Sequence, residues 1–147
     1  MSVLFSPLTL RGTTFANRLW VAPMCQYSAH DGVVGEWHRV HLGSFATGGF
    51  GLVMSEATAV SPEGRISVAC PGLYRDDQED AWRIVVDFLH SQGVLAGVQL
   101  AHAALPPLET STRSTPVSRS CSATQVISSR LSPPSTQSVA EILTKRG

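Results

Sequence analysis

Three short apolar runs, separated by two stretches of helical periodicity, constrain the fold of this chain more than any other feature. The runs cover residues 19–22, 52–57 and 94–100, and short apolar runs without polar alternation are typical of strands buried on both faces. Apolar residues at helical spacing predict helices over residues 36–47 and from residue 76 to Gly93. Sequential right-handed crossovers make the strands of a β-α-β-α-β unit parallel, so the sequence predicts a parallel α/β fold.

A small hairpin is expected ahead of these units. Residues 8–10 and 14–15 are short runs rich in residues that favour strands. Gly12 lies between them, and the lack of a Cβ suits it to a tight turn. The body of the chain is therefore expected to contain a hairpin, three parallel strands and two helices.

The composition changes abruptly after Ala103. All ten aromatic residues and 11 of the 12 glycines precede this point, whereas residues 104–147 contain ten Ser, six Thr and five Pro. Such a segment cannot bury enough apolar surface to offset the entropy of ordering its backbone, which costs about 1–2 kcal/mol per residue. We therefore expect a body over residues 1–103 and a disordered tail over residues 104–147, in which only residues 138–145 resemble a helix.

The overall charge excludes several classes of protein. Lys and Arg together number 11, and so do Asp and Glu, which excludes a polybasic protein that binds nucleic acid or a membrane surface. No apolar run approaches the roughly 20 residues that span a bilayer, and the N-terminus lacks an export signal, so a cytoplasmic protein is expected.

The scattered Cys25, Cys70 and Cys121 predict reduced thiols and no disulfide framework.

Polar and sulfur-containing side chains follow all three predicted strands. Cys25 and Tyr27 follow the first strand, Glu56 and Thr58 lie at the end of the second, and Gln99 lies at the end of the third. In parallel α/β folds the reacting groups lie beyond the carboxyl ends of the strands. Each of these residues alone is commonly a packing or capping residue, but their occurrence at three corresponding positions favours a functional site.

The residue types present restrict the chemistry of such a site. The only lysine is Lys145 in the tail, so the body lacks the lysine of Schiff-base chemistry and of a phosphate-binding P-loop. The sequence also contains no GxGxxG, CxxC or GxSxG motif, which argues against a Rossmann nucleotide site, a dithiol site and a hydrolase nucleophile elbow.

Two metal sites stay open as alternatives at this point. His38 and His41 are three residues apart on a predicted helix and would share a face, although such a pair without a carboxylate is more often an amphipathic surface. Glu56 and His102 at neighbouring strand ends are the better candidates, because barrel metallohydrolases take their ligands from such positions. The further His or Asp ligands of such a site are absent.

Four segments of the body closely resemble one enzyme family. They are LFSPLTLRGTTFANR, APMCQYS, GLVMSEATAVSPEGR and GVQLAHA, and the similarity spans residues 3–103. In order and spacing they are similar to the start of the old yellow enzyme family, in its bacterial branch with a cysteine beneath the flavin. The resemblance implies an incomplete TIM (β/α)8 barrel, with FMN as cofactor and NAD(P)H as co-substrate. It also implies transfer of hydride from the flavin to an activated alkene, the double bond of an α,β-unsaturated carbonyl compound.

The same resemblance assigns roles to the residues after the first strand. The backbone of Ala22, Pro23 and Met24 would lie against the edge of the isoalloxazine ring. Cys25 would lie near flavin N5 and C4a, where a thiol can shift the flavin potential and touch the substrate. Tyr27 would line the substrate pocket, so Cys25 and Tyr27 are the catalytic candidates.

Two residues of the later strands complete the implied flavin site. Ala57 would offer a backbone contact on the pyrimidine side, its small side chain letting the ring approach. Gln99 would hydrogen-bond the N3 and O2 region, because an amide side chain supplies both a donor and an acceptor. The three strand ends would form half of a flavin site, and no metal ligand is expected.

The resemblance stops near Ala103, where family members continue with Gly-Arg-Lys. The later residues of the family that hold the substrate carbonyl and the flavin phosphate have no counterpart, and a closed barrel takes about 250 residues. We therefore expect a truncated or frameshifted chain that is inactive alone and colourless after purification. We expect a full-length product to act on a small-molecule substrate, and we consider a homo-oligomer as its assembly state.

Two other functions are considered beside this one. The first is a metal-dependent barrel fragment that uses Glu56 and His102. The second is a non-catalytic interaction protein, in which the unpaired edge of the third strand binds a second chain and the Ser/Thr/Pro tail is a linker.

Overall fold

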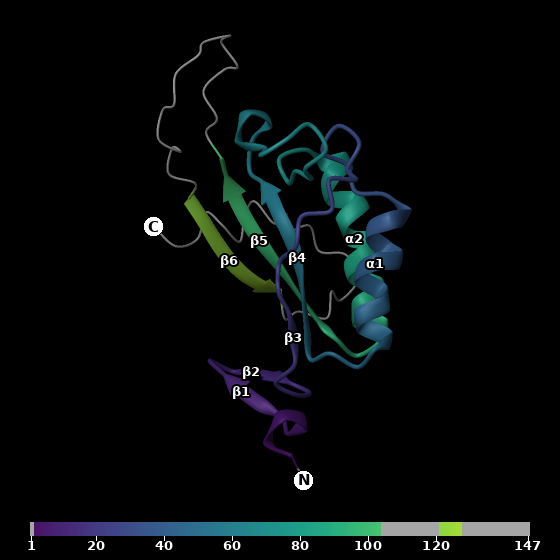
Figure 1. Cartoon of the computed structure of the whole chain (residues 1–147), viewed down its shortest axis with the longest axis vertical. Coiled ribbons are helices and arrows are strands. Elements are labelled where there is room, and N and C mark those ends of the chain that lie inside the picture. The colour runs from purple at the N-terminus through teal and green to yellow at the C-terminus, as the bar shows by residue number, and fades with distance from the viewer. Residues whose placement is uncertain (1, 104–120, 128–147) are drawn as a thin grey trace.

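The computed structural model describes residues 2–103 with their side chains and residues 121–127 as backbone. Its centre is a four-stranded sheet with the order β3-β4-β5-β6, and both helices cover the same face of this sheet (Figure 1). The sheet and its helices are β3 (Trp20–Val21), β4 (Leu52–Ala59), β5 (Leu95–His102), β6 (Cys121–Ile127), α1 (Glu36–Thr47) and α2 (Asp76–Ser91). Two short 3-10 helices, η1 (Val3–Phe5) and η2 (Pro62–Gly64), lie outside the sheet.

The predicted parallel α/β fold is confirmed. Strands β3, β4 and β5 pair in parallel, and α1 has the bounds that the sequence predicts. Both long strands extend two residues beyond their apolar runs, to Ala59 and His102. Strand β3 is short because Pro23, which follows soon after it, has no N–H to continue a ladder.

A cluster of buried apolar residues joins the helices to the sheet. Val53 and Ala96 enter it from the strands, and Leu42, Val85 and Leu89 enter it from the helices. Complete burial of one such side chain stabilises the fold by about 1.5–3 kcal/mol. In the part of the chain that the structure describes, neither helix is long and apolar enough to cross a membrane.

The predicted hairpin is also confirmed, and its last residue, Phe15, packs on the face of the sheet away from the helices. Strands β1 (Leu8–Leu10) and β2 (Thr13–Phe15) are antiparallel. Between them Arg11 and Gly12 have φ values of +46° and +83°, as a two-residue hairpin turn requires. Phe15 packs against Leu52 and Met54 in a cluster separate from the one beneath the helices.

A bulge interrupts the pairing of β4 with β5. Met54 is opposite Gly97 and Ala57 is opposite Gln99, so two residues of β4 oppose a single residue of β5. Such an extra residue bends a strand and shifts the alternation of its side chains.

The bulge decides which side chains of β4 face the helices. Val53 packs in the cluster beneath the helices, and Glu56, three residues later, contacts His38 of α1. In a regular strand two residues three apart point to opposite faces. The bulge therefore turns Glu56 toward the helices and Ala57 toward the opposite face.

The tail expectation is wrong for one segment. The sequence predicts disorder over residues 104–147 and an unpaired edge on β5, but Cys121–Ile127 forms β6 and pairs antiparallel with β5. Unpaired N–H and C=O groups along β5 favour the addition of a strand, and this segment contains the strand-favouring Thr, Val and Ile. The interaction alternative loses the edge on which it depends, and the predicted helix over residues 138–145 lies outside the described residues.

Candidate functional site

The loop after β3 brings Cys25 to the end of β4. Cys25 is partly buried, and its thiol lies near the backbone of Ala57 and the side chain of Tyr27. Burial raises the pKa of Cys25, the Ala57 backbone and Tyr27 lower it, and the nearby Cys70 and Glu56 raise it further. The net shift is upward, so the thiol is protonated at neutral pH.

Ala57 and Gln99 lie side by side at the same level of the sheet. They are Cα partners in β4 and β5, and paired residues present their side chains on the same face. Leu95 packs with Phe15 on the face away from the helices, and alternation along β5 places Gln99 on that face too. The structure thus brings Cys25, Ala57 and Gln99 close together in the carboxyl-terminal part of the sheet.

The other predicted site residues are more exposed. Ala22 is exposed and Pro23 is partly buried, while the side chains of Met24 and Tyr27 are 47% and 56% exposed. Tyr27 has a φ of +51°, a region that bulky residues rarely enter and that is enriched at functional sites. The pKa of Tyr27 is raised, first by the adjacent Cys25 and then by desolvation.

Gln26, which is not among the site residues expected from the sequence, holds this loop in place. Its backbone N–H donates to Glu56 Oε2 at 2.9 Å. Its side-chain amide donates to the carbonyl of Met24 at 3.0 Å and accepts from Trp37 Nε1 at 3.2 Å. The loop is therefore tied both to β4 and to α1.

The carboxylate of Glu56 is buried and paired with His38. The two side chains are 2% and 1% exposed, and His38 Nε2 lies 3.2 Å from Glu56 Oε1. The N–H of Gly35 donates to His38 Nδ1 at 3.2 Å, which leaves Nε2 as the ring nitrogen nearest the carboxylate. A buried carboxylate needs such partners, because burial of an unpaired charge is strongly unfavourable.

Neither metal-site alternative gains support. His38 points into the protein toward Glu56, whereas the ring of His41 stacks on Trp37 at a centroid distance of 5.7 Å. His102 lies against Gly64, where an added Cβ would come within 3.0 Å of its ring. Across residues 2–103, His, Cys, Asp and Glu side chains form no group of three that could hold a metal ion.

A pocket of about 680 Å³ adjoins Tyr27. It is lined by residues 27–31 and by Arg65, Val68 and Ala69. Arg75 fixes its rim by donating to Asp31 at 2.9 Å. This hollow is widely open, so the exposed side of Tyr27 borders a depression in the protein surface.

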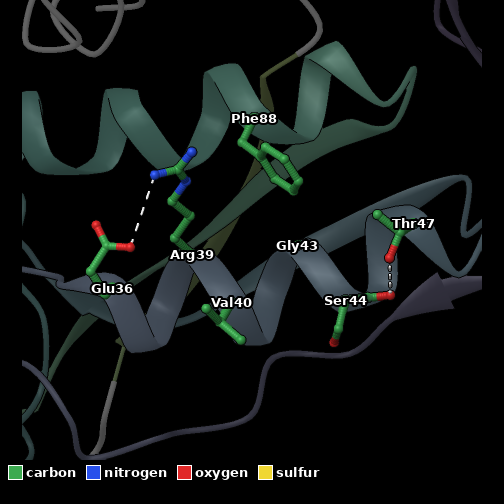
Figure 2. Close-up of a pocket in the computed structure, with 7 residues that line it drawn as sticks. All are labelled: Glu36, Arg39, Val40, Gly43, Ser44, Thr47 and Phe88. Atoms are coloured by element: carbon green, nitrogen blue, oxygen red, sulfur yellow. Dashed lines mark hydrogen bonds and ion pairs between the residues drawn. The ribbon is translucent and has the colours of Figure 1, made fainter.

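A second hollow, of about 350 Å³, lies between α1 and α2 (Figure 2). In this hollow Arg39 lies 3.9 Å from Glu36 along α1. The ring of Phe88 lies beside Gly43, where an added Cβ would come within 2.6 Å of it. No residue of the loop after β3 or of the strand ends lines this hollow, so it is separate from the candidate site.

Comparison with a family model settles the class of protein. The model of the NADH:flavin oxidoreductase / NADH oxidase family matches residues 3–145. The chain belongs to this family. The resemblance to old yellow enzyme is thereby confirmed for the body, and the boundary at Ala103 stays a prediction.

Individual relatives of the family agree with this assignment. The chain is 50% identical over 99 residues to an NADH:flavin oxidoreductase of Gibberella zeae, covering 67% of this chain and 24% of that protein. It is 50% identical over 105 residues to an NADPH dehydrogenase of Listeria welshimeri, covering 70% of this chain and 31% of that protein. The chain therefore spans about a quarter to a third of the length of these two relatives.

Solved structures of the family share the fold of the described part. Morphinone reductase matches with a TM-score of 0.64 and 37% identity, covering 68% of this chain and 26% of that one. The old yellow enzyme of Trypanosoma cruzi matches with a TM-score of 0.62 and 34% identity, covering 69% and 27%. Because these enzymes are TIM barrels, β3, β4 and β5 correspond to part of such a barrel.

Proposed function

We propose that this chain supplies the first strands of an FMN-dependent oxidoreductase that uses NAD(P)H to reduce activated alkenes, the double bonds of α,β-unsaturated carbonyl compounds. The observation that carries the proposal is the proximity of Cys25, Ala57 and Gln99 in the carboxyl-terminal part of three parallel strands and the loop after β3. Membership of the flavin oxidoreductase family and similarity to NADPH dehydrogenases support the choice of cofactors.

The groups at this edge fit a flavin. Gln99 offers a donor and an acceptor, which suit the alternating edge of a pyrimidine ring. Ala57 is small, so a flat ring can approach the backbone beside it, and the exposed Met24 offers a polarizable apolar surface. Reduction of a flavin develops negative charge near N1 and O2, and donors placed there stabilise that charge.

Bound FMN would supply the hydride chemistry, while the residues of this chain bind and orient. The Cys25 thiol, held protonated by its burial, adds no negative charge beside the ring. The exposed ring of Tyr27 borders the 680 Å³ pocket and forms one wall for a substrate. Gln99 and the backbone of Ala57 would hold the pyrimidine side, each from its own strand.

A chimera tests this proposal. Residues 3–103 replace the matching segment of the Listeria welshimeri NADPH dehydrogenase, with which the chain shares 50% identity. We expect a yellow protein that oxidises NADPH when a cyclic enone such as 2-cyclohexenone is added. The readouts are flavin absorbance and the rate of NADPH consumption.

The matched control is the same chimera with Gln99→Leu. It keeps the size of the side chain but removes both hydrogen-bonding groups, so FMN affinity should fall about tenfold or more, as expected for losing a hydrogen-bonded pair. A folded chimera that binds no FMN, or a control that binds FMN as tightly as the parent, contradicts the proposed role of this strand edge.

A further inference from the structure

The buried carboxylate of Glu56 has no part in the flavin contacts described above. It lies on the opposite face of β4 from Ala57 because of the bulge. Burial of a charge is costly unless the charge is paired and hydrogen-bonded. The contacts of Glu56 show which segments its carboxylate joins.

Each oxygen of this carboxylate contacts a different element. Oε1 lies 3.2 Å from Nε2 of His38 at the start of α1. Oε2 accepts the backbone N–H of Gln26 at 2.9 Å. Glu56 therefore links the first turn of α1, the end of β4 and the loop between Cys25 and Tyr27.

The point of attachment is the residue between the two catalytic candidates. Cys25 precedes Gln26, and Tyr27 follows it with a φ of +51°. A bulky residue stays in that conformation only when its surroundings hold it there. On the far side of Tyr27, Ala29 donates its N–H to the carbonyl of Ala69 at 3.0 Å, so the strained residue is fixed from both directions.

We propose that Glu56, oriented by His38, is a positioning residue that fixes the Cys25–Tyr27 loop and thereby sets the reactivity of the Cys25 thiol. The effect of this anchoring on catalysis rests on the proposed function, in which Cys25 lies beside the flavin. Glu56 acts through Gln26 and does not itself touch the cofactor.

The electrostatic surroundings of Cys25 give the proposal a second, separable consequence. Burial, Cys70 and the charge of Glu56 raise the pKa of the thiol, whereas the Ala57 backbone and Tyr27 lower it. Replacing Glu56 by a neutral residue removes one raising contribution, so the Cys25 pKa should fall. Replacing it by a residue without an acceptor should in addition release the loop.

The test uses the full 147-residue chain with Cys70→Ser and Cys121→Ser, so that Cys25 is its only thiol. The rate of Cys25 alkylation by iodoacetamide is followed across the titration of the thiol, which gives its pKa and its limiting rate. Amide hydrogen exchange at Gln26 reports directly on the bond to Glu56. Neither measurement requires flavin.

Two substitutions at one position separate charge from anchoring. Glu56→Gln keeps an acceptor for the Gln26 N–H, so we expect a lower Cys25 pKa and a limiting alkylation rate within about twofold of the parent. Its neutral acceptor is weaker, so exchange at Gln26 should accelerate severalfold. Glu56→Ala has no acceptor, so Gln26 exchange and the limiting rate should both rise about tenfold or more.

The matched control is Glu36→Gln. Glu36 lies in the first turn of the same helix as His38, but its side chain is 84% exposed. It should change neither the Cys25 profile nor Gln26 exchange. Far-UV circular dichroism establishes that each variant is folded.

The proposal is overturned if folded Glu56→Ala leaves Gln26 exchange and the limiting alkylation rate within twofold of the parent. If Glu56→Ala does not fold, Glu56→Gln decides: unchanged Gln26 exchange together with an unchanged Cys25 pKa overturns the proposal. A colourless chimera would contradict the proposed function without affecting these results, so the two failures are distinguishable.

Discussion

The two halves of β4 are equally buried but differ in what they bury. Leu52, Val53 and Met54 are apolar and alternate between the cluster with Phe15 and the cluster beneath the helices. The second half, from Ser55 to Ala59, contains three buried polar residues. The first half of β4 thus contributes apolar side chains to the core, whereas its second half buries polar side chains.

Hydrogen bonds among its own groups help to hold the polar half in place. The hydroxyls of Ser55 and Thr58 both donate to the carbonyl of Glu56 at 2.9 Å. Gln99 also donates its backbone N–H to the Ser55 hydroxyl at 3.4 Å across the bulge. The bulge therefore lies at the boundary between the apolar half of β4 and its polar half.

The largest effect is expected from His38→Leu, which leaves the buried carboxylate of Glu56 without its imidazole partner. Removing the partner leaves a carboxylate buried without compensation, which should lower the free energy of unfolding by about 3–5 kcal/mol. Urea denaturation measures the change. The control is His41→Leu, at a partly buried ring stacked on Trp37, which should lower the free energy of unfolding by only about 0.5–1.5 kcal/mol. Equal losses of stability in the two variants would show that the contact between His38 and Glu56 stabilises the fold no more than the contact between His41 and Trp37.

Leu52→Ala tests the apolar half of β4. Leu52 is 2% exposed, and truncation of such a side chain should cost about 2–5 kcal/mol in the free energy of unfolding. Because Leu52 lies before the bulge, the pH dependence of Cys25 alkylation should match that of the parent chain. A shifted Cys25 profile in a folded variant would mean that the two halves are coupled.

Ala57→Leu adds bulk where the flavin ring is proposed to approach. Overpacking should cost about 1–3 kcal/mol in stability, and FMN binding by the chimera should be lost. Ala57→Gly is the control: it keeps the space open and should retain FMN while costing about 0.5–1 kcal/mol. Undiminished FMN binding by Ala57→Leu would place the ring elsewhere. Unfolding experiments and flavin absorbance give the two readouts.

Thr58→Val should produce the smallest change. It removes the donor to the Glu56 carbonyl but preserves the shape of a fully buried side chain, at a cost of about 1 kcal/mol. Thr47→Val is the exposed counterpart at the end of α1 and should cost less. The difference in denaturation midpoint between the two variants measures how much more the buried hydrogen bond of Thr58 stabilises the fold than the exposed one of Thr47. Equal midpoints would show that burial adds nothing to the contribution of this hydrogen bond.

Much of the described fold could be predicted because its signals are local. The acidic first turn and apolar stripe of α2 are contained in one segment of sequence, and Gly12 marks the turn of the hairpin. The convergence of Cys25, Ala57 and Gln99 also follows from strand order, since parallel strands end at the same edge.

The network behind the loop could not be predicted in the same way. Glu56 and His38 were each noticeable as isolated polar residues, but only the bulge in β4 turns Glu56 toward α1. Gln26 gave no signal, because its role depends on a backbone N–H that every non-proline residue possesses. A lone carboxylate inside an apolar run is the sequence feature that could have directed attention to this network.

The antiparallel pairing of β6 has a consequence for assembly of a complete barrel. The hydrogen-bonding groups along the free side of β5 are already engaged by β6, whereas closure of a (β/α)8 barrel requires a parallel neighbour at that position. Strand β6 and the next parallel strand of a barrel would occupy the same position beside β5. Any route from this chain to a closed barrel must therefore begin with the departure of β6.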